Sequence, residues 1–195
     1  PNNSRYFEAE ATVQRVAIED LTTGEHTIIN EYQTTKGGKQ AYDFETYDLF
    51  SEGWISASDL CDSPIGNFAS CASATPVLSG VIPADSNAGG FDTAAGSARH
   101  FTIRNGTWVG TGIFSGPTLT SGSYAADSLT QIELKFHVDA STCADSYTVQ
   151  GTLVCEVLIT WGGHISSQAD WGAGNSAVNI NGSPYHQKVV KLDGS

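Results

Sequence analysis

The sequence contains no methionine, only nine lysine and arginine residues, and no long apolar segment. Its 21 aspartate and glutamate residues give a formal net charge of -12. This balance argues against nucleic acid and anionic membranes as partners and favours cations. A helix that spans a membrane needs about 18 or more consecutive apolar residues. The chain has no such run, so we expect no membrane span. Few basic residues and no methionine are typical of an extracellular β protein, and we expect any signal peptide to have been removed.

Helical periodicity is nearly absent, whereas β patterns are frequent. Residues 129–138 alternate between apolar and polar side chains, which predicts a strand with one buried and one solvated face. Further strands are expected over residues 11–20, 26–32, 147–161, 178–180 and 187–192. Strands separated by Gly, Ser and Asn, with no helices between them, predict an all-β fold. We expect one antiparallel β-sandwich, jelly-roll-like, with long Gly/Ser-rich loops.

Two turns are expected to form hairpins. Residues 21–24 (LTTG) separate the first two predicted strands. Asn105 and Gly106 lie inside residues 101–109, between two short β runs. Asn-Gly is the strongest short hairpin signal, because both central residues of the turn need positive φ. Gly151 is expected to mark a bulge or bend within the strand 147–161.

The chain shows no internal repeat and no linker, so residues 13–195 are expected to form one sandwich domain. Residues 1–12 have an extended, alternating character. They are either an edge strand of their own sandwich or a donor strand that completes the sheet of a neighbour. Tyr6 and Phe7 would be anchors, and Phe7, Ala9 and Ala11 would form the buried face of the donor strand.

Four cysteines occur as two local pairs, Cys61 with Cys71 and Cys143 with Cys155. Neither pair has the spacing of a zinc ribbon or a redox motif. Three connectivities are open, and we favour the two local ones. Disulfides of this kind indicate an oxidising compartment.

The segment 161–186 (WGGHISSQADWGAGNSAVNINGSPYH) carries the densest set of candidate functional residues. His164, Ser166 and Asp170 are the residue types of a serine hydrolase, but no nucleophile-elbow motif is present. His164, Asp170 and His186 could instead bind zinc. Trp161, Trp171 and Tyr185 could stack on sugar rings, as in a carbohydrate-binding or adhesin module that takes glycans. The simpler alternative is that the aromatic residues pack the segment onto the core.

Calcium is the ion that an acidic chain with Asn-rich turns favours, because it takes carboxylate, carbonyl and amide oxygens in irregular geometry. The candidate ligands are Asp43, Glu45, Asp48, Asp59 and Asp62. No EF-hand or repeat-type calcium motif is present. A solvated acidic surface is the alternative for each of these residues.

Two stretches resemble known surface proteins. Residues 162–186 (GGHISSQADWGAGNSAVNINGSPYH) look like a segment of secreted bacterial and archaeal surface proteins. SRYFEAEATVQRVAIED and GGKQAYDFETYDLFSEGW, near the N-terminus, resemble the cannula proteins of hyperthermophilic archaea, which build extracellular hollow tubes.

This resemblance implies a jelly-roll structural subunit without catalytic activity. Calcium would promote its assembly with copies of itself into a head-to-tail polymer, and the N-terminal strand would pass into the next subunit. In the segment 161–186, the resemblance and the glycines together favour a long connection over the end of the sandwich. Its residues His164, Asp170, Trp171, Asn175 and His186 would then be hydrogen-bonding or packing residues.

Overall fold

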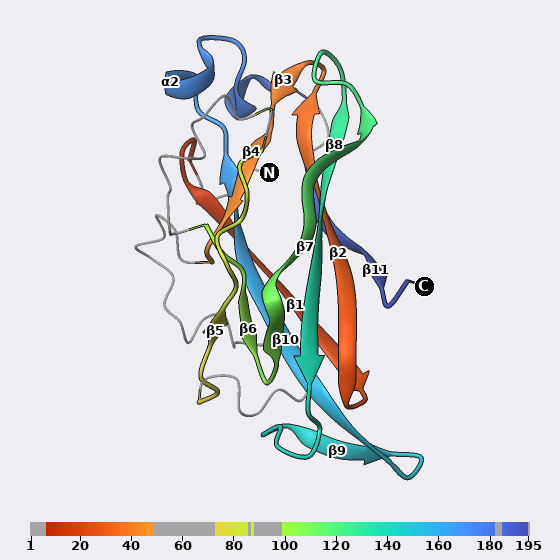
Figure 1. The fold of residues 1–195 in the computed structure, drawn as a ribbon. Helices are drawn as coiled ribbons and strands as arrows, with labels where there is room; N and C mark the ends of the chain where they lie inside the picture. The colour runs from red at the N-terminus through yellow and green to blue at the C-terminus, as the bar shows by residue number, and fades with distance from the viewer. Residues whose placement is uncertain (1–6, 49–72, 86, 88–98, 182–184, 195) are drawn as a thin grey trace.

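The computed structural model describes residues 7–48, 73–85, 87, 99–181 and 185–194. Over these residues the chain forms two antiparallel sheets that pack as a sandwich (Figure 1), so the predicted fold class is confirmed. Among the helices of these ranges, none is both long and apolar enough to cross a membrane. The candidates that lie outside the described residues are Tyr6, Asp59, Asp62, Cys61 and Cys71.

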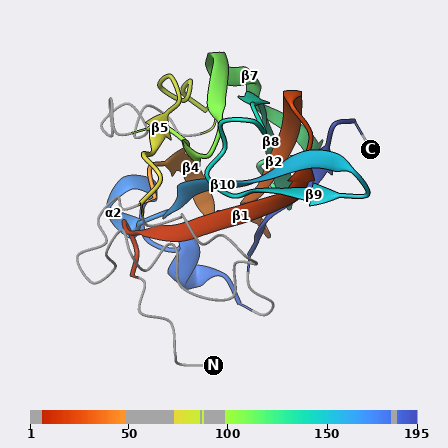
Figure 2. The same cartoon turned by 90° about the horizontal axis from the view of Figure 1, so that it is seen from below.

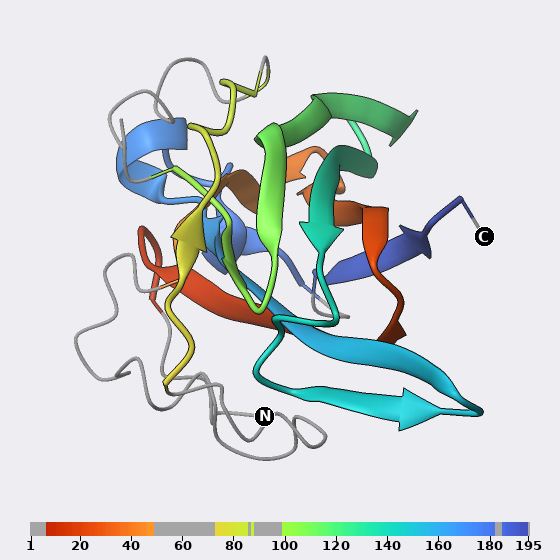
Figure 3. The same cartoon turned by 60° about the horizontal axis from the view of Figure 1, so that its bottom comes forward.

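The first sheet is built around β10 (Thr152–Ile165), its longest strand. One edge of β10 pairs with β1 (Ala11–Leu21). The other edge pairs in succession with β9 (Ser146–Val149), β6 (Thr102–Arg104) and β4 (Tyr42–Thr46), and β5 (Val77–Leu78) pairs with β6. Figures 2 and 3 show the β9–β10 hairpin extending away from the rest of the molecule.

The second sheet has β2 (Gly24–Lys36) and β8 (Ser128–Val138) at its centre. β7 (Thr107–Gly122) pairs with β8, and β11 (Gln187–Leu192) pairs with β2. The short β3 (Lys39–Gln40) adds to the end of β2. β7 and β11 are therefore the outer strands of this sheet.

The core forms between β8 and β10. The alternation predicted in β8 is confirmed, since Ile132, Leu134, Phe136 and Val138 have no exposed surface. In β10 the odd-numbered residues from Cys155 to Trp161 belong to the same core cluster. Full burial of one large apolar side chain contributes about 1.5–3 kcal/mol. These two alternating strands therefore hold the sheets together.

The predicted hairpin between residues 11–20 and 26–32 is wrong, because β1 and β2 belong to different sheets. Ile18 on β1 and Ile28 on β2 are both buried in the one core. The connection through Thr22 and Thr23 crosses from one sheet to the other, so both apolar faces reach this core from opposite sides. A turn signal indicates a change of direction, but not the sheet in which the next strand pairs.

The predicted hairpin at Asn105 and Gly106 is also wrong, because β6 and β7 lie in different sheets. Of these two residues only Asn105 has positive φ, at 61°, whereas a type I′ hairpin turn needs both. Such a turn occurs instead at Gln150 and Gly151, with φ of 48° and 85°, between β9 and β10. Gly151 therefore ends a strand rather than bending one.

The C-terminal predictions have different outcomes. The strand expected at 187–192 is β11. The strand expected at 178–180 is wrong, because this stretch is the 3-10 helix η3 (Ala177–Asn179). Its first amides donate to side chains, Ala177 N to Ser166 Oγ and Val178 N to Glu8 Oε1, instead of to a neighbouring strand.

Candidate functional site

The segment that starts at Trp161 begins as the last five residues of β10, not as a loop. Its two glycines are required by close approaches. A Cβ on Gly163 would lie 1.6 Å from Gln187 Nε2, and one on Gly162 would lie 2.5 Å from the Tyr47 carbonyl oxygen. Trp161 is 3% exposed, and its Nε1 donates to Gln187 Oε1 at 2.7 Å. The glycines thus let β11 and the chain after β4 approach β10.

A fully buried carboxylate lies where β4, β10 and α2 (Gln168–Trp171) meet. Asp43 Oδ1 is 2.6 Å from His164 Nδ1, and Asp43 Oδ2 accepts a hydrogen bond from Trp171 Nε1 at 3.0 Å. The His164 ring stacks on Phe44, with 4.1 Å between the ring centroids. Asp43 therefore joins three elements, and Trp171 is tied to the first sheet through its indole nitrogen.

The other residues of the segment have local partners. Asp170 Oδ2 accepts from Ser167 Oγ at 2.6 Å, and Ser167 caps the start of α2. The Asn175 carbonyl accepts from Gln40 N at 2.9 Å, and the His186 carbonyl accepts from Gln33 N at 3.0 Å. Within the described ranges, no three or more His, Cys, Asp or Glu side chains are grouped so as to hold a metal ion.

Ser166 has a structural environment rather than that of a hydrolase nucleophile. Its Oγ donates to the Gln40 carbonyl at 2.7 Å and accepts from Ala177 N at 3.0 Å. A hydroxyl has one proton to donate, and here that proton is directed to Gln40 rather than to His164. The hydrolase alternative requires Ser166 to donate to a base, and in this arrangement it does not.

An N-terminal arm, residues 7–10, lies against the segment through the side chain of Glu8. Glu8 Oε1 accepts from Ser176 Oγ at 2.5 Å and from Val178 N at 3.2 Å. Glu8 Oε2 accepts from Gln168 N at 3.3 Å. Burial alone would raise the pKa of Glu8, but these hydrogen bonds outweigh it and lower the pKa below its usual value. Glu8 thus connects the arm to both short helices of the segment.

In its own subunit the arm does not present Phe7, Ala9 and Ala11 on one common face. Phe7 is 71% exposed, whereas Ala11 is buried and pairs with His164 as the first residue of β1. Between them Ala9 has φ of 67° and lies in a turn. The turn closes because Phe7 N donates to Glu10 Oε2 at 2.7 Å. The extended strand therefore starts at residue 11, inside the predicted 1–12 boundary, and pairs within its own domain.

The predicted calcium ligands of β4 and the following residues have separate partners. Asp43 binds His164 and Trp171 as described, and Asp48 Oδ2 accepts from Thr160 Oγ1 at 2.5 Å. Glu45 is 1% exposed; its Oε1 accepts from Asn30 Nδ2 at 3.4 Å, while its Oε2 is buried without a hydrogen-bond partner. Burial raises the pKa of Glu45 well above its usual value, despite the Asn30 hydrogen bond and the Arg99 charge. In the described residues these three carboxylates are not grouped as one set of metal ligands.

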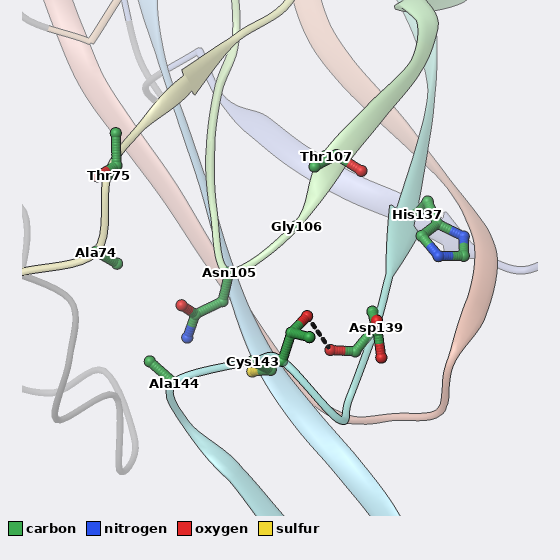
Figure 4. A pocket seen from close by; sticks show the side chains of 10 residues that line it. Ala74, Thr75, Asn105, Gly106, Thr107, His137, Asp139, Cys143 and Ala144 are labelled. Atoms are coloured by element: carbon green, nitrogen blue, oxygen red, sulfur yellow. Dashed lines mark hydrogen bonds between the residues drawn. The ribbon is translucent and has the colours of Figure 1, made fainter.

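The disulfide Cys143–Cys155 is formed, as predicted, and ties the chain before β9 to β10. Next to it, Asn105 Nδ2 donates to Asp145 Oδ2 at 2.7 Å. Asn105 and Cys143 line a hollow of about 330 Å³, and Figure 4 shows the side chains around it. The lining residues are Ala74, Thr75, Asn105, Gly106, Thr107, His137, Asp139, Thr142, Cys143 and Ala144.

The sequence does not predict the roles of Glu8, Gln187 and Asp43. Their partners are far along the chain, up to 170 residues away for Glu8. No local pattern marks such contacts. Comparisons of the chain with protein family models, with curated proteins and with solved structures find no match.

Proposed function

We propose that this protein is a secreted structural subunit that assembles with copies of itself, head to tail, into extracellular filaments or tubes. Exchange of the N-terminal arm between subunits would form the joint, and calcium would promote the contact. The observation that carries the proposal is the way the arm is attached. Its described contacts all lie at one end of the sandwich, and Phe7 at its tip is exposed.

The attachment of the arm supports exchange because the same contacts can form between two copies. Ala9 N donates to the Ile165 carbonyl, and Ile165 N donates to the Glu10 carbonyl, at 2.9 and 2.8 Å. The arm of a neighbouring subunit could form these two backbone hydrogen bonds, and the Glu8 hydrogen bonds, in the same place. Exchange of an identical element is a low-cost route to association. A head-to-tail contact that does not close on itself gives a filament.

The outer strands of the second sheet are a weaker candidate for the joint. Within the described residues no strand pairs with the outer edge of β7 or β11, and Phe114 on β7 is 64% exposed. However, β7 contains repeated register shifts and Pro117. Such features oppose regular edge-to-edge pairing. We therefore place the joint at the arm.

Charge and the disulfide support the other parts of the proposal. A net charge of -12 makes neighbouring subunits repel one another, and a divalent cation between carboxylates reverses the sign of the local interaction. The Cys143–Cys155 disulfide is typical of proteins from an oxidising compartment.

Replacement of the exposed Phe7 by serine tests the proposal. In the free subunit Phe7 is 71% exposed, so Phe7→Ser should leave chemical denaturation almost unchanged, within about 0.5 kcal/mol. In the joint, Phe7 would in addition be buried against the neighbouring subunit, so the change should nevertheless prevent the growth in particle size that calcium induces in the wild type. Light scattering and electron microscopy of the full chain measure this. Phe114→Ser is the matched control, because Phe114 is similarly exposed and should not be needed.

Deletion of residues 1–10 should leave a folded monomer that does not assemble, since β1 begins at Ala11. If the truncated chain unfolds, the arm belongs to its own core and exchange is wrong. If Phe114→Ser blocks assembly and Phe7→Ser does not, the joint lies at β7. A wild type that stays monomeric with and without calcium would contradict the proposed function as a whole.

A further inference from the structure

Three carboxylates from separate parts of the sequence lie at one level of the first sheet. Glu156 lies on β10, between β1 and β9. On the β1 side, Ile18 pairs with Val157 and Leu21 with Cys155, so Glu19 and Asp20 form a bulge opposite Glu156. On the β9 side, Ser146 pairs with Cys155, and Glu156 N donates to the Asp145 carbonyl at 3.4 Å. Register therefore places Glu19 and Asp145 on either side of Glu156.

These acidic residues repel one another in a site where one of them is buried. Glu156 is 1% exposed, and its Oε1 is buried without a hydrogen-bond partner. Desolvation raises the pKa of Glu156, and the charges of Glu19 and Asp145 raise it further, with no basic residue acting against them. A buried carboxylate oxygen without a donor costs free energy unless a cation or a proton satisfies it.

Two other glutamates, by contrast, have basic partners. Glu25 pairs with Lys135 at 2.6 Å, and Glu31 pairs with Lys188 at 2.9 Å. Arg104 lies opposite Leu158, two residues along β10 from Glu156, but its charge interacts with Asp48. Glu156 is thus distinct in combining burial, an unpartnered oxygen and two acidic neighbours.

The surrounding contacts fix the positions of these acids. Tyr147 Oη donates to Asp20 Oδ1 at 2.8 Å and so ties β9 to the bulge of β1. Asn105 Nδ2 donates to Asp145 Oδ2 and to the Glu156 carbonyl, at 2.7 and 3.2 Å. The Cys143–Cys155 disulfide ends one residue before Glu156. The backbone that carries the acids is therefore held from three sides.

We propose that Glu19, Asp145 and Glu156 bind a divalent cation, and that calcium is the ion these oxygen ligands favour. Glu19 is exposed and gives the ion access, whereas Glu156 supplies the buried oxygen. The side chains are not grouped at metal-binding distances, so Glu19 or Asp145 must rotate toward Glu156 as the ion enters. Calcium accepts this, because its coordination is irregular and includes water and carbonyl oxygens. The site differs from every ligand set that the sequence suggests.

Ion uptake by the full chain tests this site without reference to assembly. Calorimetric titration with calcium chloride over about 0.01–10 mM covers the affinities of extracellular calcium sites. Glu156→Gln and Asp145→Asn should each remove one bound ion or weaken its binding by about tenfold or more. Glu45→Gln is the matched control, since Glu45 is also a buried glutamate with an unpartnered oxygen but has no acidic neighbour among the causes of its shifted pKa. It should leave binding unchanged.

Terbium luminescence locates the ion. Tyr147 is next to the bulge and would sensitise terbium bound there. Calcium should quench this emission, and Tyr147→Phe should reduce it. Wild-type affinity and stoichiometry in both Glu156→Gln and Asp145→Asn would overturn the site, as would loss of binding in Glu45→Gln alone. A chain that binds no divalent ion overturns it too, whereas a chain that binds calcium here but stays monomeric contradicts only the proposed function.

Discussion

Buried carboxyl groups in this protein differ by what lies next to them. Asp43 accepts hydrogen bonds from two ring nitrogens, Glu45 accepts one from an amide, and Glu156 has two acidic neighbours. The free energy of a buried carboxylate depends on such partners more than on burial itself. A buried carboxyl group is therefore structural at Asp43, a site of protonation at Glu45 and a candidate cation ligand at Glu156.

Glu45 should make the stability of the fold depend on pH. Burial raises its pKa well above the ordinary value of 4.5, so the folded chain keeps this proton to a higher pH than the unfolded chain. Stability from this group is complete below about 4.5 and is lost as the pH rises toward the folded-state pKa. Glu45→Gln should match the wild type in acid and become the more stable protein as the pH rises. Denaturant unfolding at several pH values measures the difference.

The control for this prediction is Glu25→Gln. Glu25 is exposed and paired with Lys135, which lowers its pKa through a hydrogen bond and charge. Its replacement should not stabilise the protein at neutral pH. A Glu45→Gln variant that is less stable than the wild type at pH 8 would contradict this prediction. It would show that the ionised Glu45 carboxylate has an interaction that outweighs the free-energy cost of burying its charge.

At the scale of elements, the end of β10 joins β4, α2 and β11. Trp161 bonds to Gln187 on β11, and His164 and Trp171 meet at Asp43 on β4. The glycines between Trp161 and His164 make room for these partners. The segment therefore fixes one end of the sandwich.

Asp43→Asn should destabilise the fold. An amide offers one acceptor oxygen where the carboxylate offers two, so either His164 or Trp171 loses its acceptor and the new NH₂ group faces a donor. Leaving a buried polar group unsatisfied costs about 1–3 kcal/mol. Guanidinium unfolding followed by tryptophan fluorescence measures the loss. Asp139→Asn is the control, because Asp139 also accepts hydrogen bonds, from Ser141, but in an exposed turn. Equal losses in the two variants would show that the Asp43 contacts add nothing beyond a surface turn.

Hydrophobic alternation and turn residues in the sequence predict where strands form, but not which strands pair with one another. The alternation of β8 predicts its buried face correctly, because each side chain faces either the core or solvent and its polarity reflects that environment. The sheet in which β1 or β6 pairs depends on the whole sandwich, so LTTG and Asn105 with Gly106 suggest hairpins that do not form. Likewise the sequence shows that Asp43 and Glu156 are acidic, but the register between distant strands determines which residues lie next to them.

At the scale of the whole molecule, the arm determines whether a subunit is complete by itself. With Glu8 bound to Ser176, Val178 and Gln168, the described chain satisfies its own N-terminal contacts. A polymer built by exchange would contain the same contacts between copies. The Glu8 hydrogen bonds therefore stabilise the closed monomer and the joint equally. They must break when the arm moves from one state to the other, so they contribute to the activation barrier.

Weakening the Glu8 contact should consequently change the rate of assembly rather than its extent. Glu8→Gln removes the charge that Ser176, Val178 and Gln168 stabilise, so the arm should leave sooner and the lag before polymer growth should shorten. The final mass of polymer should stay close to that of the wild type, because monomer and joint lose the same interaction.

Acid should act in the same direction as this substitution and shorten the lag. The lowered pKa of Glu8 means that its contribution to holding the arm is present above the ordinary value of 4.5 and is lost as the pH falls through the folded-state pKa. Light scattering after calcium addition gives the lag and the plateau. Glu10→Gln is the control, since the Glu10 side chain accepts a hydrogen bond from Phe7 N within the arm turn. A Glu8→Gln protein with an unchanged lag and a lower plateau would mean that Glu8 stabilises the polymer alone, and that the arm is not exchanged between equivalent places.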